Sequence, residues 1–229
     1  MIRDAVGDAG KIDITTGSLS ATNGSQINSF TRGQGDAGDI SINATDSVTF
    51  DGVDGNGNSS GLYSSVEAGG VGVGGNIKLE AGSLSLTNGG LLNASVRGAS
   101  DSLPSGRGKG GNINIQTGNL VARNDGLISS STSGQGDSGN IAITANNSIF
   151  LDALDIVNNV NSDAVGDAGK IDITTGSLSA TNGSQINSFT RGQGNAGDIT
   201  FKLPTQLLLM ESIVMAIPVV YLAALKLVV

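Results

Sequence analysis

The chain has 229 residues, of which 36 are glycine, 3% are aromatic and none is cysteine, histidine or tryptophan. The absence of Cys and His excludes disulfides and thiolate chemistry and removes the commonest general base and metal ligand. A net charge of -8 disfavours nucleic acid and anionic membranes as partners and suits a solvated extracellular surface.

The chain starts with Met1-Ile2-Arg3-Asp4, which contains neither an apolar run nor a small-residue cleavage site. We therefore expect no signal peptide in this chain, although the composition suits a location outside the cell. Residue 4 instead enters a repeat that is already in progress, because residues 163–194 repeat residues 4–35 letter for letter.

Looser copies of the same phrase fill the sequence between these two identical segments. Each copy begins with an isoleucine anchor in a Gly-x-Ile-x-Ile-like core, and the separations between anchors are 28, 37, 36, 28, 30 and 28 residues. The seven anchors are Ile12, Ile40, Ile77, Ile113, Ile141, Ile171 and Ile199. A period of this length is typical of a solenoid and predicts one elongated domain over residues 1–202.

Within one unit the apolar residues alternate instead of recurring at helical spacing. The first unit places Ile12 and Ile14, then Leu19 and Ala21, then Ile27 on one face, and this period of two indicates strands. Turn-forming glycines follow at Thr16-Gly17, Asn23-Gly24 and residues 33–38. Three short strands and three corners per unit predict an all-β parallel β-helix of about six coils, with the anchors in register along one wall and their side chains inward.

The second and fifth units differ from the others in a shared way. Their second-strand apolar residues stand 8 and 10 positions after the anchor, at Val48 and Phe50 and again at Ile149 and Leu151, instead of 7 and 9. A one-residue slip would turn these side chains outward, so we predict a β-bulge or an altered turn there. The longer loops at residues 54–61 and 99–110 should protrude from the stack.

Glycine-rich corners at residues 33–38, 134–139 and 192–197 spell a literal GxGxxG. Each precedes a predicted strand, whereas a dinucleotide fingerprint opens a helix, so we interpret them as solenoid corners. The same corners leave calcium open as an alternative at Asp36 and Asp39 or at Asp167, beside the simpler interpretation of solvated turn residues. The nine-residue period of calcium-loaded β-rolls is missing.

Two further residue classes recur without predicting a site. Asparagines at one corner should form a side-chain amide ladder or supply left-handed backbone, and they are Asn23, Asn88, Asn124 and Asn182. Asp13 and Asp172 alternate with isoleucines and should point outward. No unit carries the clustered carboxylates of a polysaccharide-cleaving enzyme, so we assign no catalytic, cofactor-binding or metal-binding residue and expect no cofactor.

Whole phrases over residues 4–202, such as Gly-Asn-Ile-x-Ile, Asp-Ser-Val-Thr-Phe-Asp-Gly-Val and Gly-Gln-Gly-Asp-Ala-Gly, resemble the repeat region of filamentous haemagglutinin-like exoproteins. The resemblance implies a right-handed parallel β-helix, secretion through an outer-membrane partner, surface exposure and adhesion to carbohydrate or a cell receptor. The family's Asn-Pro-Asn-Gly type secretion motif is not found in this sequence. A carbohydrate-active β-helix enzyme and a calcium-dependent β-roll stay as alternatives.

Residues 203–229 are apolar and resemble a membrane segment, but Glu211, Pro218 and Lys226 interrupt the run, so we expect no functional membrane span. Synonymous codons exist for this segment which, when read two nucleotides later, encode a peptide that matches residues 47–70 at 22 of 24 positions. We therefore predict that the tail is a repeat unit read out of frame, through a gene frameshift or a sequencing error, and that it does not continue the solenoid.

Overall fold

The computed structural model describes residues 5–100, 102–203, 208–210 and 225–228, and these residues contain strands and no helix. No helix in this part of the chain is therefore long and apolar enough to cross a membrane. The strands are β1 (Ile12–Thr22), β2 (Gln26–Asn28), β3 (Ile40–Asp51), β4 (Gly61–Tyr63), β5 (Ile77–Thr87), β6 (Leu91–Asn93), β7 (Ile113–Ser129), β8 (Ile141–Val157), β9 (Ile171–Thr175), β10 (Leu178–Thr181), β11 (Gln185–Asn187), β12 (Ile199–Lys202), β13 (Leu208–Met210) and β14 (Leu225–Val228).

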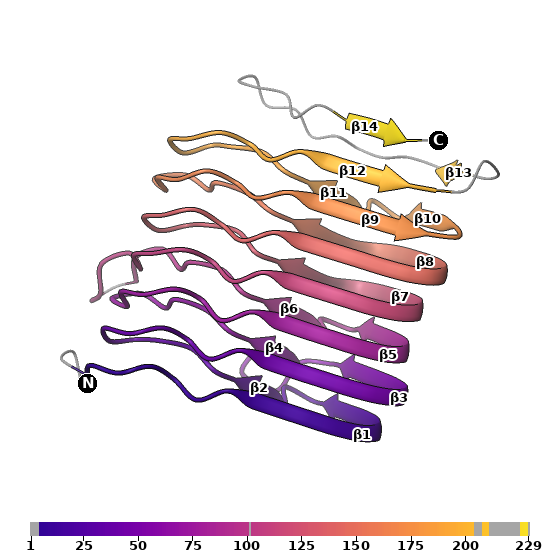
Figure 1. Cartoon of the computed structure of the whole chain (residues 1–229), viewed down its shortest axis with the longest axis horizontal. Helices are drawn as coiled ribbons and strands as arrows, with labels where there is room; N and C mark the ends of the chain where they lie inside the picture. Colours follow the sequence, from indigo (N-terminus) through magenta and orange to yellow (C-terminus); the bar gives the residue numbers. More distant parts are fainter. Residues whose placement is uncertain (1–4, 101, 204–207, 211–224, 229) are drawn as a thin grey trace.

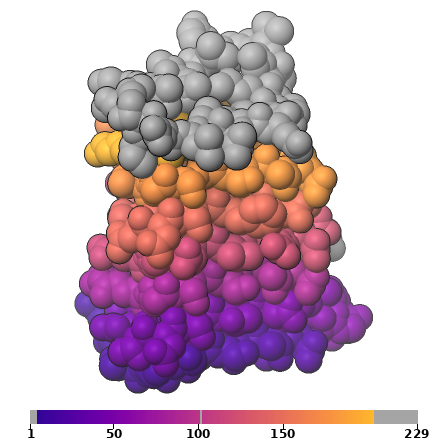
Figure 2. Space-filling model, turned by 90° about the vertical axis from the view of Figure 1, so that its right-hand side faces the viewer, coloured from indigo at the N-terminus to yellow at the C-terminus, as the bar shows by residue number. Residues whose placement is uncertain are grey.

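These strands stack as the coils of a parallel β-helix (Figure 1). One wall runs β1-β3-β5-β7-β8-β9-β12, and every neighbouring pair in it is parallel. The predicted anchors pair directly with one another from Ile12↔Ile40 through Ile171↔Ile199, which confirms the predicted register. Figure 2 shows the coils as successive layers from indigo to orange.

The hydrophobic core runs along the inside of the stack. Anchors from Ile40 to Ile171 are fully buried, while Ile12 and Ile199 in the outer coils are partly buried. Asp13 and Asp172 are exposed, as predicted from their alternation with isoleucine. Apolar residues therefore line the inside of each coil and polar residues the outside, which is how period-two alternation stabilises a solenoid.

The first corner is a bend within a continuous strand, not the break that Thr16-Gly17 suggests. Strand β1 runs through that dipeptide, and β7 and β8 each run through the whole coil wall. Threonine hydroxyls hold the bend, because Oγ1 of Thr16, Thr117 and Thr175 each donates to the carbonyl oxygen two residues later at 3.0 Å. Parallel pairing with the next coil keeps the strand regular on either side of it.

The predicted bulges lie in β3 and β8. Two residues of β1, Thr16 and Ser18, bracket the step that takes three residues, Ala44 to Ser47, in β3. The same extra residue separates Ala145 from Ser148 opposite β7. The bulge absorbs the one-residue slip, so Val48, Phe50, Ile149 and Leu151 all remain inside the core.

The two long loops fold back on themselves outside the coil ladders. Val53 and Ser59 form an isolated antiparallel bridge, as do Ser100 and Leu103. In the first loop the Asp54 carboxylate accepts hydrogen bonds from the backbone of Asn56 and Asn58, both at 2.8 Å. These local bonds close the loop without disturbing the coils above and below.

Each coil continues after its third strand into a flat arm, seen at the left of Figure 1. Two columns of isolated parallel bridges run along the arms, one through Thr31, Val66 and Val96 and the other through Gln34 and Val71. One column of stacked residues consists only of glycine: Gly10, Gly38, Gly75, Gly111, Gly139, Gly169 and Gly197. A Cβ on Gly139 would lie 2.1 Å from the carbonyl oxygen of Gly111, so the close stacking of arms requires glycine there.

The segment after Lys202 differs from the expectation that it would not continue the solenoid. Strand β13 pairs in parallel with β10, and β14 pairs in parallel with β12. The expectation is therefore wrong for these seven residues, because the last coil presents open strand edges that apolar residues can cover by adding to the ladder. The remainder of that prediction lies outside the described residues.

Candidate functional site

The acidic residues named as calcium candidates act as coil-to-coil connectors. The Asp36 carboxylate accepts a hydrogen bond from the Val73 backbone N–H at 2.7 Å, and the Asp167 carboxylate accepts one from the Asn195 N–H at 2.7 Å. Asp39 likewise accepts from the Asn76 N–H at 2.8 Å. In the described part of the chain no three acidic residues gather as a potential metal site.

Asparagines extend the same column in the middle of the stack. The Oδ1 atom of Asn76 accepts from the Asn112 N–H at 3.0 Å, Asn112 accepts from the Asn140 N–H at 2.9 Å, and Asn140 accepts from the Lys170 N–H at 2.8 Å. Each side chain thus binds the backbone of the equivalent residue in the next coil. This ladder stabilises the arm corners and uses one oxygen of every side chain in it.

The predicted asparagine corner is present in both of the forms expected. Asn23, Asn88, Asn124 and Asn182 all adopt left-handed backbone, with φ between 50° and 55°. Asn124 Nδ2 also donates to Asn88 Oδ1 at 2.9 Å.

In the bulged coils the left-handed position moves one residue onward. Asp51 and Asp152 pair with threonines, and Gly52 and Ala153 take the positive φ. Sequence counting had instead placed these aspartates opposite the asparagines, because it does not register the extra bulge residue.

Asp51 links the second coil to the third at this corner. Its Oδ1 accepts from Thr87 Oγ1 at 2.5 Å and from Asn88 Nδ2 at 2.8 Å. These two bonds, the threonine first, lower the pKa of the Asp51 carboxyl. Asp152 makes the same pair of contacts with Thr181 and Asn182.

A column of buried hydroxyls inside the arms was missed from the sequence. Ser29 Oγ donates to the Gly10 carbonyl at 2.7 Å and accepts from the Gly38 N–H at 3.1 Å, so it joins the two sides of the arm. Ser130 Oγ does the same with Gly111 and Gly139, at 2.7 and 3.0 Å. The available signal was a recurring Ser or Asn 17 residues after the anchor, at Ser29, Ser130, Asn158 and Ser188.

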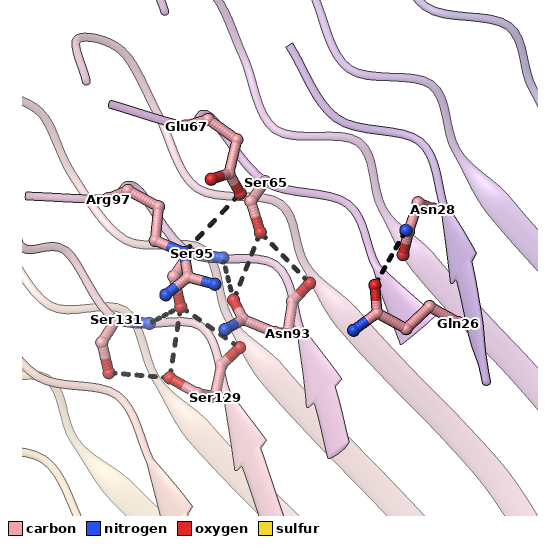
Figure 3. A network of polar contacts seen from close by, with 9 residues as sticks. All are labelled: Gln26, Asn28, Ser65, Glu67, Asn93, Ser95, Arg97, Ser129 and Ser131. Carbon is pink, nitrogen blue, oxygen red and sulfur yellow. Dashed lines mark hydrogen bonds and ion pairs between the residues drawn. The ribbon is translucent and has the colours of Figure 1, made fainter. Parts of the chain in front are cut away.

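Outside this column lies a lateral surface of hydroxyl and amide groups, which we call the polar face (Figure 3). It consists of Ser65, Asn93, Ser95, Ser129 and Ser131, all of which are buried. Ser95 N–H donates to Asn93 Oδ1 at 2.9 Å, and the hydroxyls of Ser95 and Ser129 lie 3.2 Å apart. These groups largely satisfy one another, so they order the wall and leave the groups around them for contact with solvent.

Charged and aromatic side chains surround the polar face. Glu67 and Arg97 form an ion pair at 3.6 Å, and Arg97 is about half exposed. In the first coil Arg32 lies 4.5 Å above the Phe30 ring, and in the sixth Arg191 lies 4.6 Å above the Phe189 ring. The bridge register places Phe30 and Phe189 in the same column as Ser65, Ser95 and Ser131. The face therefore carries two identical cation–π pairs that flank it along the solenoid axis.

Comparison with protein-family models, curated proteins and solved structures finds no match to this chain. The arrangement of the residues therefore has to carry the functional argument. The exposed guanidinium groups, the aromatic rings beneath them and the neighbouring carboxylate suit binding of hydroxyl-rich or charged ligands by stacking and hydrogen bonds. This polar face, with Arg32, Arg97 and Arg191 at its edge, is the candidate binding site.

Proposed function

We propose that the chain is a non-enzymatic spacer and adhesive segment of a large filamentous haemagglutinin-like surface protein. The observation that carries the proposal is the uninterrupted parallel stack, in which recurring Asp, Asn and Ser side chains join one coil to the next. A stack of this kind is rigid and presents a long lateral surface. Its polar face supplies weak, repeated contacts, and repeated weak contacts gain avidity when many act together.

The proposed partners are surface carbohydrate or a receptor on a neighbouring or host cell. The proposed location is the outside of the cell, reached by the parent protein through an outer-membrane secretion partner. Support comes from the resemblance of the repeat phrases to that family together with the net charge of -8. The two Arg–aromatic pairs are the groups best placed to bind sugar rings or acidic sugars.

A bead-retention assay on a glycan array and on cultured cells tests this function. The test variant is Arg32→Ala with Arg191→Ala, and the matched control is Lys11→Ala with Lys170→Ala, which removes the same charge from another corner of the same two coils. We expect the arginine variant to lose retention several-fold and the lysine variant to retain it. Equal retention by both variants and the parent chain would reject the polar face as the contact surface.

The two alternative functions give different results. Release of reducing ends from acidic or neutral polysaccharides would indicate a carbohydrate-active enzyme. A large gain of strand signal in circular dichroism on addition of calcium would indicate a calcium-dependent β-roll. Either result would replace the adhesive proposal.

A further inference from the structure

The two identical segments of the sequence occupy different environments. Residues 4–35 form the first coil, and residues 163–194, which are the same sequence 159 positions later, form the sixth coil. The sixth coil stacks on the fifth, whereas no described coil lies beneath the first. The pair therefore compares one sequence with and without a neighbour on its N-terminal face.

The first coil is exposed where its copy is covered. Val6 is 79% exposed and Val165 is 45% exposed, while Ile12 is partly buried and Ile171 fully buried. Leu19 is also partly buried, and its counterpart Leu178 is 1% exposed. The fifth coil supplies the missing cover in the sixth.

The contacts that the fifth coil makes are specific to its own sequence. Asp152 accepts hydrogen bonds from Thr181 and Asn182, and Asn159 Oδ1 accepts from the Phe189 N–H at 3.0 Å. The Leu154 N–H donates to Ser184 Oγ at 3.1 Å, and Asn140 Oδ1 accepts from the Lys170 N–H at 2.8 Å. The first coil carries the same partners in the same order: Lys11, Thr22, Asn23, Ser25 and Phe30.

We infer that the N-terminal face of the first coil is a docking surface for a coil with the sequence of residues 134–162, supplied as a second copy of that segment in the same polypeptide. The five coils of residues 4–162 are then one structural period that stacks on itself. Five coils at about 4.8 Å each give a period of about 24 Å along the axis. Each period would repeat the Phe30–Arg32 pair in the same column, which goes beyond the adhesive function proposed above.

Gly10 provides a sensitive probe of this docking. A Cβ on Gly10 has nothing within 4 Å, whereas a Cβ on its copy Gly169 would lie 2.1 Å from the carbonyl oxygen of Gly139. Replacing either glycine by alanine changes the same local sequence. Only a docked coil can make the change at Gly10 costly.

The test extends the full chain by joining a second copy of residues 77–162 ahead of Asp4, which recreates the Ser162–Asp163 junction. We expect the extension to raise the melting midpoint, and Gly10→Ala to lower it by about 4 °C or more in the extended chain but by less than about 1 °C in the original. Gly169→Ala in the original chain is the positive control and should resemble Gly10→Ala in the extended chain.

A matched extension with residues 40–133, which ends in the fourth coil, separates specific docking from general stacking. We expect it to stabilise the first coil less than the extension that ends in the fifth coil. Equal stabilisation by both extensions, or an unchanged cost of Gly10→Ala in the extended chain, would overturn the inference.

Amide exchange in the original chain gives an independent check. The Lys170 N–H, which is bonded to Asn140, should exchange slowly, and the Lys11 N–H should exchange fast because its partner coil is missing. Slow exchange at Lys11 would show that another molecule already covers this face, and the inference would fail.

Discussion

At the scale of single residues, alternation decides which side chains stabilise the solenoid. Ile113 and Asp13 both stand on the wall strands, yet the first is fully buried and the second is exposed. Period-two patterning is sufficient to predict this from the sequence, because a side chain in a strand can only face inward or outward. The hydrogen-bond partners of polar residues are harder to predict, since they lie in another coil 28 to 37 residues away.

Ile113→Asp and Asp13→Ala test the predicted facing directly. The first places an unpaired carboxylate in the core and should cost about 3 to 5 kcal/mol of unfolding free energy. The second removes an exposed carboxylate and should change stability by about 0.5 kcal/mol or less. Urea denaturation of both variants measures the difference, and similar losses would contradict the assigned orientation.

Asp155 predicts a pH dependence of stability. Burial raises the pKa of its carboxyl above the ordinary value, a backbone hydrogen bond from Gln185 lowers it, and the nearby Asp125 charge raises it. A raised pKa means that the folded state holds the proton more tightly than the unfolded state. The contribution of Asp155 to stability is therefore favourable below the unfolded pKa and is lost as the pH rises through the folded value.

Asp155→Asn removes the charge and keeps an oxygen that can accept from Gln185. We expect the variant to be more stable than the parent chain at pH 7 and to show no advantage at pH 3, where the carboxyl is protonated. Melting curves at the two pH values measure this. A variant that is less stable at pH 7 would show that the ionised carboxylate stabilises the fold.

At the scale of the coil, the corners are less predictable than the walls. The extra residue in β3 and β8 is predictable because Val48 and Phe50 would otherwise leave the core. The arm is not predictable, because its two sides are joined by single bridges and by Ser29 and Ser130, which carry no apolar period. The coil is accordingly a wall of three strands plus a flat arm, not a simple triangle.

Ser130→Ala tests the role of the buried hydroxyl column in the arm. The hydroxyl bonds to the Gly111 carbonyl and the Gly139 N–H, so its removal leaves two buried backbone groups without that partner. We expect a loss of about 1 to 3 kcal/mol. Ser20→Ala, on an exposed position of β1, is the control and should be nearly neutral. Equal melting midpoints for the two variants would show that the column contributes little.

At the scale of the whole molecule, the candidate site depends on stacking more than on any one motif. The Arg–aromatic pairs at Phe30 and Phe189 are readable in the sequence, but their position in one column with Ser65 and Ser95 follows only from the coil register. Sequence reasoning therefore located the solenoid and left the site unassigned. Loops of different length between the anchors prevent residue counting from aligning the third strand.

The C-terminal segment gives the last prediction. If residues 203–229 are a repeat unit read out of frame, replacing them by the shifted-frame peptide Ala-Asn-Ser-Val-Thr-Phe-Asp-Gly-Val-Asp-Ser-Asn-Gly-Asn-Ser-Ser-Gly-Leu-Phe-Ser-Ser-Val-Glu-Ala-Gly-Gly should extend the stack by a bulged coil on β10 and β12. This coil would follow the sixth as the second follows the first, with Ser-Val-Thr-Phe-Asp in place of Ser47–Asp51. It would place alternating residues over the core where the present segment is apolar throughout.

We expect the replaced chain to melt at a higher temperature and to stay monomeric at concentrations where the original associates, because it exposes less apolar surface. A chain ending at Lys202 is the control for simple removal of the apolar residues. Equal melting temperatures for the replaced and truncated chains would mean that the shifted-frame peptide does not form a coil. Sequencing of the locus provides the genetic test, since nucleotides after Lys202 that encode no repeat in the shifted frame would contradict this origin of the segment.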